Sequence, residues 1–209
     1  MREIFRYTLL ADGSSDKVLI PIIDWVIGQH LPGVRSVSAF ARDFGRVGSV
    51  LEDRVQAALD YFPCDLLIVH RDAEGMSCED RVAEVAAALV KCHVPYVALV
   101  PVKMSEAWLL SDEAAIRFAA GNASGNKALE LPKRQRWETI ADPKFVLLQA
   151  LRIASGKAGR ALDKFNPEKA RHLITPRTES FERLRGLPAF DAFEADLSNQ
   201  LEKIRNALD

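Results

Sequence analysis

Residues 66–75 of the chain read LLIVHRDAEG, an unbroken apolar run that leads into two carboxylates. A short aliphatic run without polar alternation is typical of a strand that is buried on both faces of a parallel sheet. Asp72 and Glu74 follow two residues apart, so their side chains project to the same side if the extended geometry continues. The stretch therefore predicts a buried parallel strand with an acidic carboxyl end. The alternative is a polar loop in which Asp72 caps the next helix, but Ser77, with Asp80 three residues later, is the better cap signal.

The first apolar run, residues 5–11, ends in a similar way at Asp12-Gly13-Ser14-Ser15-Asp16. One interpretation is a strand-to-helix turn, in which glycine supplies the turn and serine or aspartate caps the helix. The other places Asp12 at the carboxyl end of a strand as a metal ligand or general base, where Gly13 lets a phosphate approach the helix N-terminus. Both interpretations stay open from the sequence.

Strand-like and helix-like segments alternate through the first half of the chain. The strands are expected at residues 5–11, 34–41, 65–70 and 95–102. The intervening helices, with apolar side chains at helical spacing, are expected at residues 16–30, 47–61 and 79–92. This alternation predicts an α/β domain with a four-stranded, mainly parallel sheet flanked by helices.

The alternation stops near residue 103, and only helix-like segments follow. They cover residues 106–120, 144–153, 167–174, 180–185 and 190–208, and residues 121–136 are expected to form a polar loop. We therefore predict an α/β domain over residues 1–112 and an all-helical C-terminal extension over residues 113–209 that packs on it.

Composition narrows the class of protein only modestly. The chain has 209 residues and a formal net charge of −1, which gives no global signal for nucleic acid or membrane, so any nucleic-acid surface must be a local patch. Its three cysteines are odd in number and lack paired spacing, which disfavours a disulfide framework or a zinc site and favours a reducing compartment. The first residues are too charged for a signal peptide, and no apolar run reaches about 18 residues. We predict a cytoplasmic protein that does not engage a membrane.

Carboxylates that converge at strand ends repel one another unless a cation joins them, and Mg²⁺ prefers oxygen ligands of this kind. We therefore expect Asp12, Asp72 and Glu74 to bind Mg²⁺ or Mn²⁺, with Glu106 nearby and either Asp12 or Glu106 as general base. The alternative for Glu106 is a first-turn glutamate favoured by the helix dipole. Asp112 is six positions further on, roughly 240° round a helix, and does not share its face.

Other candidate residues are weaker signals. His70 ends the strand before Asp72 and is either an acid/base group or a packed side chain. A basic cluster at Lys133, Arg134 and Arg136 is either a nucleic-acid-binding patch or a solvated face. The chain has no phosphate-binding Gly-x-x-x-x-Gly-Lys-[Ser/Thr] motif and lacks the glycine pattern of a dinucleotide fold after the first strand.

These acidic motifs in this order resemble the Toprim (topoisomerase–primase) domain. Asp12-Gly13 resembles its first motif, a Glu-Gly-type turn, and Asp72-Ala73-Glu74 resembles its Asp-x-Asp pair. Residues 105–112, SEAWLLSD, and residues 142–144, DPK, are similar to segments of small Toprim-like proteins of uncharacterised function, some of them encoded beside ATPases in bacterial defence loci. The resemblance implies a Mg²⁺ site for phosphodiester chemistry. Asp12 in place of Glu and Glu74 in place of Asp keep the charge but change the reach of each side chain by one methylene.

Three functional hypotheses follow. The first is a divalent-metal-dependent nuclease or related phosphodiester-processing protein that acts on nucleic acid, for example as one subunit of a defence system. The second is a non-catalytic Toprim-like partner module whose helical half docks an ATPase. The third, a small-molecule phosphotransfer or receiver-like domain, is disfavoured because Lys103 is the only candidate lysine at a later strand end.

Overall fold

The computed structural model describes residues 4–42, 44–45, 47–73, 75–102 and 105–206. Its centre is a four-stranded sheet in the order β2-β1-β3-β4, and every neighbouring pair is parallel. The strands are β1 (Ile4–Leu10), β2 (Arg35–Ala41), β3 (Leu66–His70) and β4 (Tyr96–Leu99). The predicted α/β class and the four-stranded parallel sheet are therefore confirmed.

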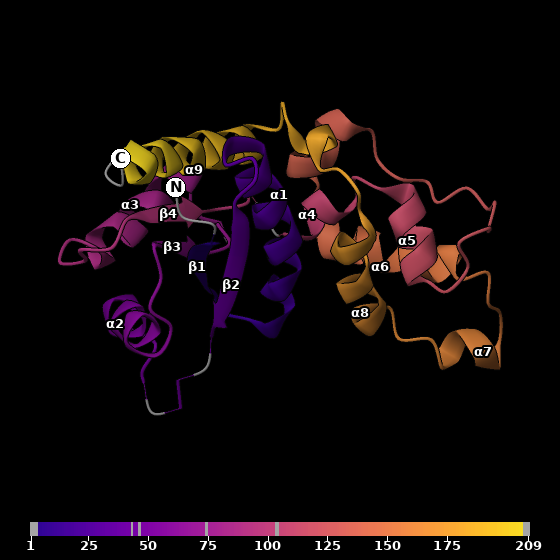
Figure 1. The fold of residues 1–209 in the computed structure, drawn as a ribbon. Coiled ribbons are helices and arrows are strands. Elements are labelled where there is room, and N and C mark those ends of the chain that lie inside the picture. The colour runs from indigo at the N-terminus through magenta and orange to yellow at the C-terminus, as the bar shows by residue number, and fades with distance from the viewer. Residues whose placement is uncertain (1–3, 43, 46, 74, 103–104, 207–209) are drawn as a thin grey trace.

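Alternation along the strands divides the core into two parts. Leu66 and Ile68 of β3 belong to one hydrophobic cluster, whereas Leu67 and Val69 belong to another on the opposite face. The second cluster packs against α2 (Leu51–Tyr61) and α3 (Cys78–Ala88). In Figure 1 these two helices lie on one side of the sheet, and α1 (Ile20–His30) lies on the other. All five side chains of β3 are buried, as the unbroken apolar run predicts.

The turn after β1 is tighter than the predicted helix over residues 16–30. The chain forms the 3-10 helix η1 (Ser14–Leu19) before α1 begins. The reason is local, since the N–H of Gly13 donates to Asp16 Oδ2 at 2.9 Å and draws the turn closed. Asp16 is thereby held beside the end of β1.

Every described element after β4 is helical, as expected for the C-terminal half. The α-helices are α4 (Glu106–Leu109), α5 (Glu113–Ala119), α6 (Pro143–Ala154), α7 (Arg160–Asp163), α8 (Pro167–Ala170) and α9 (Pro188–Asn206). The 3-10 helices are η2 (Arg134–Thr139), η3 (Arg171–Leu173), η4 (Thr175–Arg177) and η5 (Glu182–Leu184). No helix in the described ranges is both long and apolar enough to cross a bilayer.

Several predicted boundaries in this half differ from the structure, and two of the differences have a clear local cause. The expected helix over residues 106–120 is broken between α4 and α5, because the Asp112 carboxylate accepts a hydrogen bond from the Ala115 N–H at 3.0 Å and starts a new helix. The expected loop over residues 121–136 contains the start of η2. That segment is fixed by Trp137, which is buried and donates from Nε1 to the Pro132 carbonyl at 2.9 Å.

The helical half and the sheet share one core. Trp108 of α4 is fully buried and meets Phe190 of α9 edge-on, with ring centroids 5.4 Å apart. The same cluster contains Leu9 of β1 and Leu99 of β4. Helix α9 lies beside β4 and α1 in Figure 1, and it contacts both. The domain boundary at residue 112 stays a prediction.

Candidate functional site

The sheet has a topological switch point between β1 and β3. From β1 the chain passes to β2 on one side, then crosses to β3 on the other side. Leu10 pairs with Val69, so the two central strands end almost level with each other. Parallel sheets bind ligands in the space outside strand ends at such a point. Asp12 and Asp72 follow these two strands directly, so the structure brings them to the same edge of the sheet.

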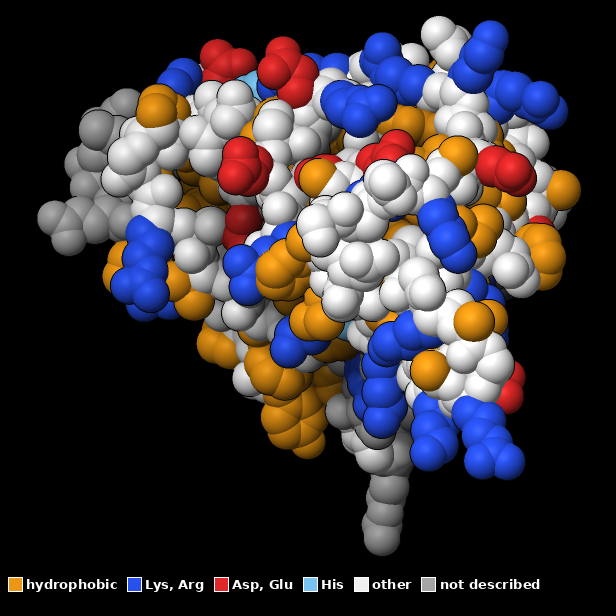
Figure 2. Space-filling model, turned by 90° about the vertical axis from the view of Figure 1, so that its right-hand side faces the viewer, with side chains coloured by type: hydrophobic (Ala, Val, Ile, Leu, Met, Phe, Trp, Pro, Cys, Tyr) orange, Lys and Arg blue, Asp and Glu red, His pale blue; other side chains and the backbone are white. Residues whose placement is uncertain are grey.

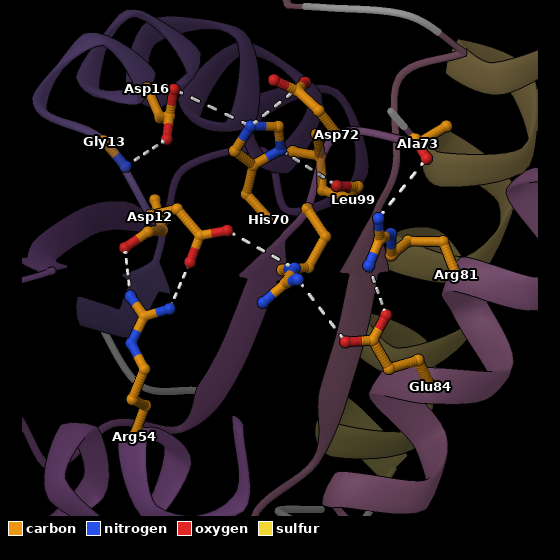
Figure 3. A network of polar contacts seen from close by, with 12 residues as sticks. Asp12, Gly13, Asp16, Arg54, His70, Asp72, Ala73, Arg81, Glu84 and Leu99 are labelled. Carbon is orange, nitrogen blue, oxygen red and sulfur yellow. Dashed lines mark hydrogen bonds and ion pairs between the residues drawn. The ribbon is translucent and has the colours of Figure 1, made fainter. Parts of the chain in front are cut away.

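Asp12 is held by two arginines. Arg54 of α2 forms an ion pair with Asp12 Oδ1 and also donates from Nη2 to the Ala11 carbonyl at 2.7 Å. Arg71 approaches Asp12 Oδ2 from the other side, with its Nε at 3.4 Å. Figure 3 shows the contact between Arg54 and the Asp12 carboxylate. Half of the Asp12 side chain is nevertheless exposed, so solvent and small ligands reach it.

His70 lies between two further carboxylates. Its Nδ1 is 3.1 Å from the Leu99 carbonyl and donates to it, because a carbonyl oxygen only accepts. Nε2 then faces Asp16 Oδ1 at 3.8 Å and Asp72 Oδ1 at 3.6 Å (Figure 3). Both distances are too long for direct hydrogen bonds. The two carboxylates and the ring nitrogen thus surround a space with groups that a cation could join.

The arginines continue the network away from the sheet. Arg71 Nη2 lies 3.5 Å from Glu84 of α3, which also pairs with Arg81. Arg81 in turn donates to the Ala73 carbonyl at 3.4 Å, and so ties the loop after β3 to α3. Acidic and basic groups therefore alternate across this edge, and neither sign dominates it.

The donor set fits a hard divalent ion in its chemistry, since carboxylate oxygens and an imidazole nitrogen gather at one edge. In the described ranges, however, no group of three or more His, Cys, Asp or Glu side chains is arranged to hold a metal. Glu74, the third predicted ligand, lies outside the described residues, as does Lys103. A metal at Asp12 would have to replace Arg54 or Arg71 as the partner of its carboxylate.

Glu106 lies in a different environment. Its side chain is buried and forms an ion pair with Arg171 of η3, and each of these side chains is 9% exposed. Arg171 also contacts Glu168 at 3.1 Å. Among the described residues, Glu106 makes no hydrogen bond or ion pair with Asp12 or Asp72. Asp112, the weaker candidate, serves as the cap of α5.

The predicted basic cluster is exposed. Lys133 caps η2, and Arg134 and Arg136 lie within it. The Arg134 guanidinium passes so close to Gly186 that a Cβ there would lie 2.7 Å from its Nη2. Figure 2 shows that lysine and arginine side chains gather in several places on the face of the helical half. The exposed basic residues of this half also include Lys157, Arg160, Lys164 and Lys169.

Sequence reasoning missed the residues that surround Asp12 and Asp72. Asp16 could have been identified from the sequence, because it lies one helical turn after Asp12 in a strand-to-helix turn. Arg71 could also have been identified, as the neighbour of Asp72 at a strand end. Arg54 had no local signal, since its contact with Asp12 spans 42 residues and depends on how α2 docks.

No protein-family model, no curated protein and no solved structure matches this chain. The resemblance to Toprim domains therefore rests on the short sequence motifs described above and on their order.

Proposed function

We propose that this chain is a Toprim-like, divalent-metal-dependent protein that processes phosphodiesters in nucleic acid, most simply a nuclease. One observation carries the proposal: Asp12 and Asp72 follow the two central parallel strands, at the edge of the sheet where its switch point lies. An exposed carboxylate at that place on a rigid scaffold is suited to binding chemistry rather than to packing.

In this proposal Asp12, Asp72 and Glu74 would hold Mg²⁺ or Mn²⁺, and a metal held there would offset charge on the attacking and leaving oxygens of a phosphodiester. Arg54 and Arg71 neutralise Asp12 before a metal binds. Once released, their guanidinium groups would have the donor geometry that phosphate oxygens accept. The role of Glu106 as a general base stays a prediction, since its described partner is Arg171.

A cleavage assay with Mn²⁺ or Mg²⁺ on single- and double-stranded DNA and RNA tests the proposal. Asp12→Asn and Asp72→Asn should each lower cleavage at least about a hundredfold, because loss of a residue that only supports a metal ligand already costs 10–100-fold. Asp163→Asn on α7 is the matched control, since Asp163 is exposed and far along the chain from the site. Cleavage that survives in both site variants would rule out this site as the catalytic centre.

The basic cluster has its own test. Replacing Lys133, Arg134 and Arg136 together by alanine should weaken nucleic-acid binding for all sequences and reduce the salt slope by about one for each lost phosphate contact. The matched control removes three other exposed charges, at Lys157, Arg160 and Lys164. Equal affinity and slope in the native protein and the first triple variant would mean that residues 133–136 form a solvated face.

A second function is favoured by a different observation. Because Arg54 and Arg71 already neutralise Asp12, the site is stable without a metal, as expected of a Toprim-like module that has lost activity. Such a module would act by docking a partner ATPase, as one subunit of a defence system. Co-purification of an ATPase, together with no cleavage of any nucleic acid by the complex, would favour this function over the first.

A further inference from the structure

A cavity of about 370 Å³ lies between the turn that follows β1 and the 3-10 helices of the C-terminal half. Lys17, at the end of η1, lines one side, and His172 and Thr175, of η3 and η4, line the other. The remaining wall is apolar, with Val18 and Pro21 among its residues. None of the described lining residues is acidic.

Two polar side chains that line this cavity have no side-chain partner among the described residues. Lys17 is exposed and forms no ion pair with any carboxylate in the described ranges. Thr175 is 1% exposed, and its Oγ1 has no hydrogen-bond partner among the described residues. Since buried hydroxyl groups are nearly always paired, an unpaired one beside a cavity suggests that a ligand supplies the missing partner.

Charge and chemistry decide the class of ligand. Lys17 brings the positive charge and three donors, and the hydroxyl of Thr175, which lines the cavity without a described partner, adds one more donor. Burial, followed by the nearby Arg171 guanidinium, lowers the pKa of His172, so its ring is neutral at pH 7 and offers one N–H donor. The carboxylate of Asp16, next to Lys17, accepts from the Gly13 N–H at 2.9 Å and is not among the residues that line the cavity.

We infer that this cavity is an oxyanion site that binds a phosphate group through Lys17, Thr175 and His172. The phosphate is either free inorganic phosphate or a phosphate of a nucleic-acid backbone, which present the same oxygens to these donors. The cavity shares no residue with the proposed metal site, and its test uses no metal. Each of the two proposals can therefore fail without the other.

Calorimetry of the full chain with inorganic phosphate, in EDTA and at constant ionic strength, tests the inference without any metal. Lys17→Gln should weaken binding about tenfold, as expected for one lost charge-assisted hydrogen bond. Lys127→Gln, which removes the same charge from an exposed loop, should leave affinity within about twofold. Equal affinities in the native protein and the Lys17 variant would overturn the site.

Thr175→Val separates ligand binding from a purely structural role. Removing a buried hydroxyl that has no partner should raise the melting temperature of the ligand-free protein, whereas the shift caused by phosphate should shrink. A lower melting temperature with an unchanged phosphate shift would show that the hydroxyl is structural and contradict the inference.

An oligonucleotide without terminal phosphates identifies the source of the group. If it displaces phosphate from the native protein but not from a background in which Lys17 is replaced, the cavity binds the nucleic-acid backbone. If phosphate stays bound at saturating oligonucleotide, the ligand is free phosphate. Weakened phosphate binding in the Lys127 control as large as that in the Lys17 variant would overturn both assignments.

Discussion

Asp12 and Glu106 both follow a strand in the sequence and both pair with an arginine, yet the two ion pairs differ in their surroundings. Half of the Asp12 side chain is exposed, whereas the Glu106 and Arg171 side chains are each 9% exposed. An exposed pair is weak because water screens it and solvates either partner when the pair opens. A buried pair cannot open cheaply, because each charge would be left without solvent. We therefore expect Asp12, at the strand ends, to exchange its arginine partner for a ligand. We expect the buried pair of Glu106 and Arg171, where the sheet meets the helices, to stabilise the fold.

The largest expected effect on stability lies at the buried ion pair between Glu106 and Arg171, where the sheet meets the helices. Arg171→Ala should destabilise the fold by about 3–5 kcal/mol, because it leaves the Glu106 carboxylate buried without its partner. Urea unfolding measures the change. The double variant with Glu106→Leu and Arg171→Met should recover most of the loss, since apolar residues of similar size often replace a buried pair without cost. A loss of stability below about 1 kcal/mol in Arg171→Ala would show that the buried pair is no stronger than an exposed one and would contradict its structural role.

A third ion pair, between Arg185 and Glu194, has intermediate exposure and tests the comparison of the Asp12 and Glu106 pairs further. Arg185 donates to Glu194 of α9 at 3.0 and 2.8 Å, and this hydrogen bonding is the main reason that the pKa of Glu194 lies below its ordinary value of 4.5. A depressed carboxyl pKa stabilises the fold above the unfolded value, and the contribution disappears as pH falls through the folded pKa.

Glu194→Gln should therefore cost about 1 kcal/mol at pH 7, and the difference from the native protein should shrink and then disappear as the pH falls below the ordinary carboxyl pKa of 4.5. Thermal unfolding across this pH range measures it. Glu202→Gln, an exposed position on the same helix, should show no pH-dependent difference. A Glu194 effect that grew at low pH would contradict the sign of the argument.

The smallest effect on stability is expected at the strand ends. Arg54→Met keeps the aliphatic stem but removes the partner of Asp12, and should change the free energy of unfolding by no more than about 1 kcal/mol. If Asp12 binds a metal as proposed, Arg54 competes with that metal, and the same variant should bind Mn²⁺ more tightly than the native protein. A cost of several kcal/mol with no gain in metal affinity would place Asp12 in the same structural class as Glu106.

Local patterns predicted the strands well because each strand signal is contained in a few residues. The run from Leu66 to Val69 is sufficient to indicate burial on both faces. The helix break at Asp112 was missed because capping by an aspartate competes with helical periodicity, and the periodicity of Trp108, Leu109 and Ile116 masked it.

The candidate site could be predicted only in part, for a physical reason. Asp12 and Asp72 were found because strand ends are recognisable in the sequence. Arg54 and the burial of Glu106 were not, since the latter depends on Arg171, 65 residues away. Contacts over such separations are fixed by the docking of helices, which no local pattern encodes.

Titration of the native protein with Mn²⁺ by calorimetry, beside Asp12→Asn and Glu106→Gln, tests the central claim most directly. The claim is that the exposed carboxylate at the switch point binds a metal, while the buried one stabilises the fold. We expect native binding to be lost in Asp12→Asn and retained in Glu106→Gln, even though the latter unfolds more easily. Equal Mn²⁺ binding by the native protein and Asp12→Asn, or loss of binding in Glu106→Gln alone, would contradict it.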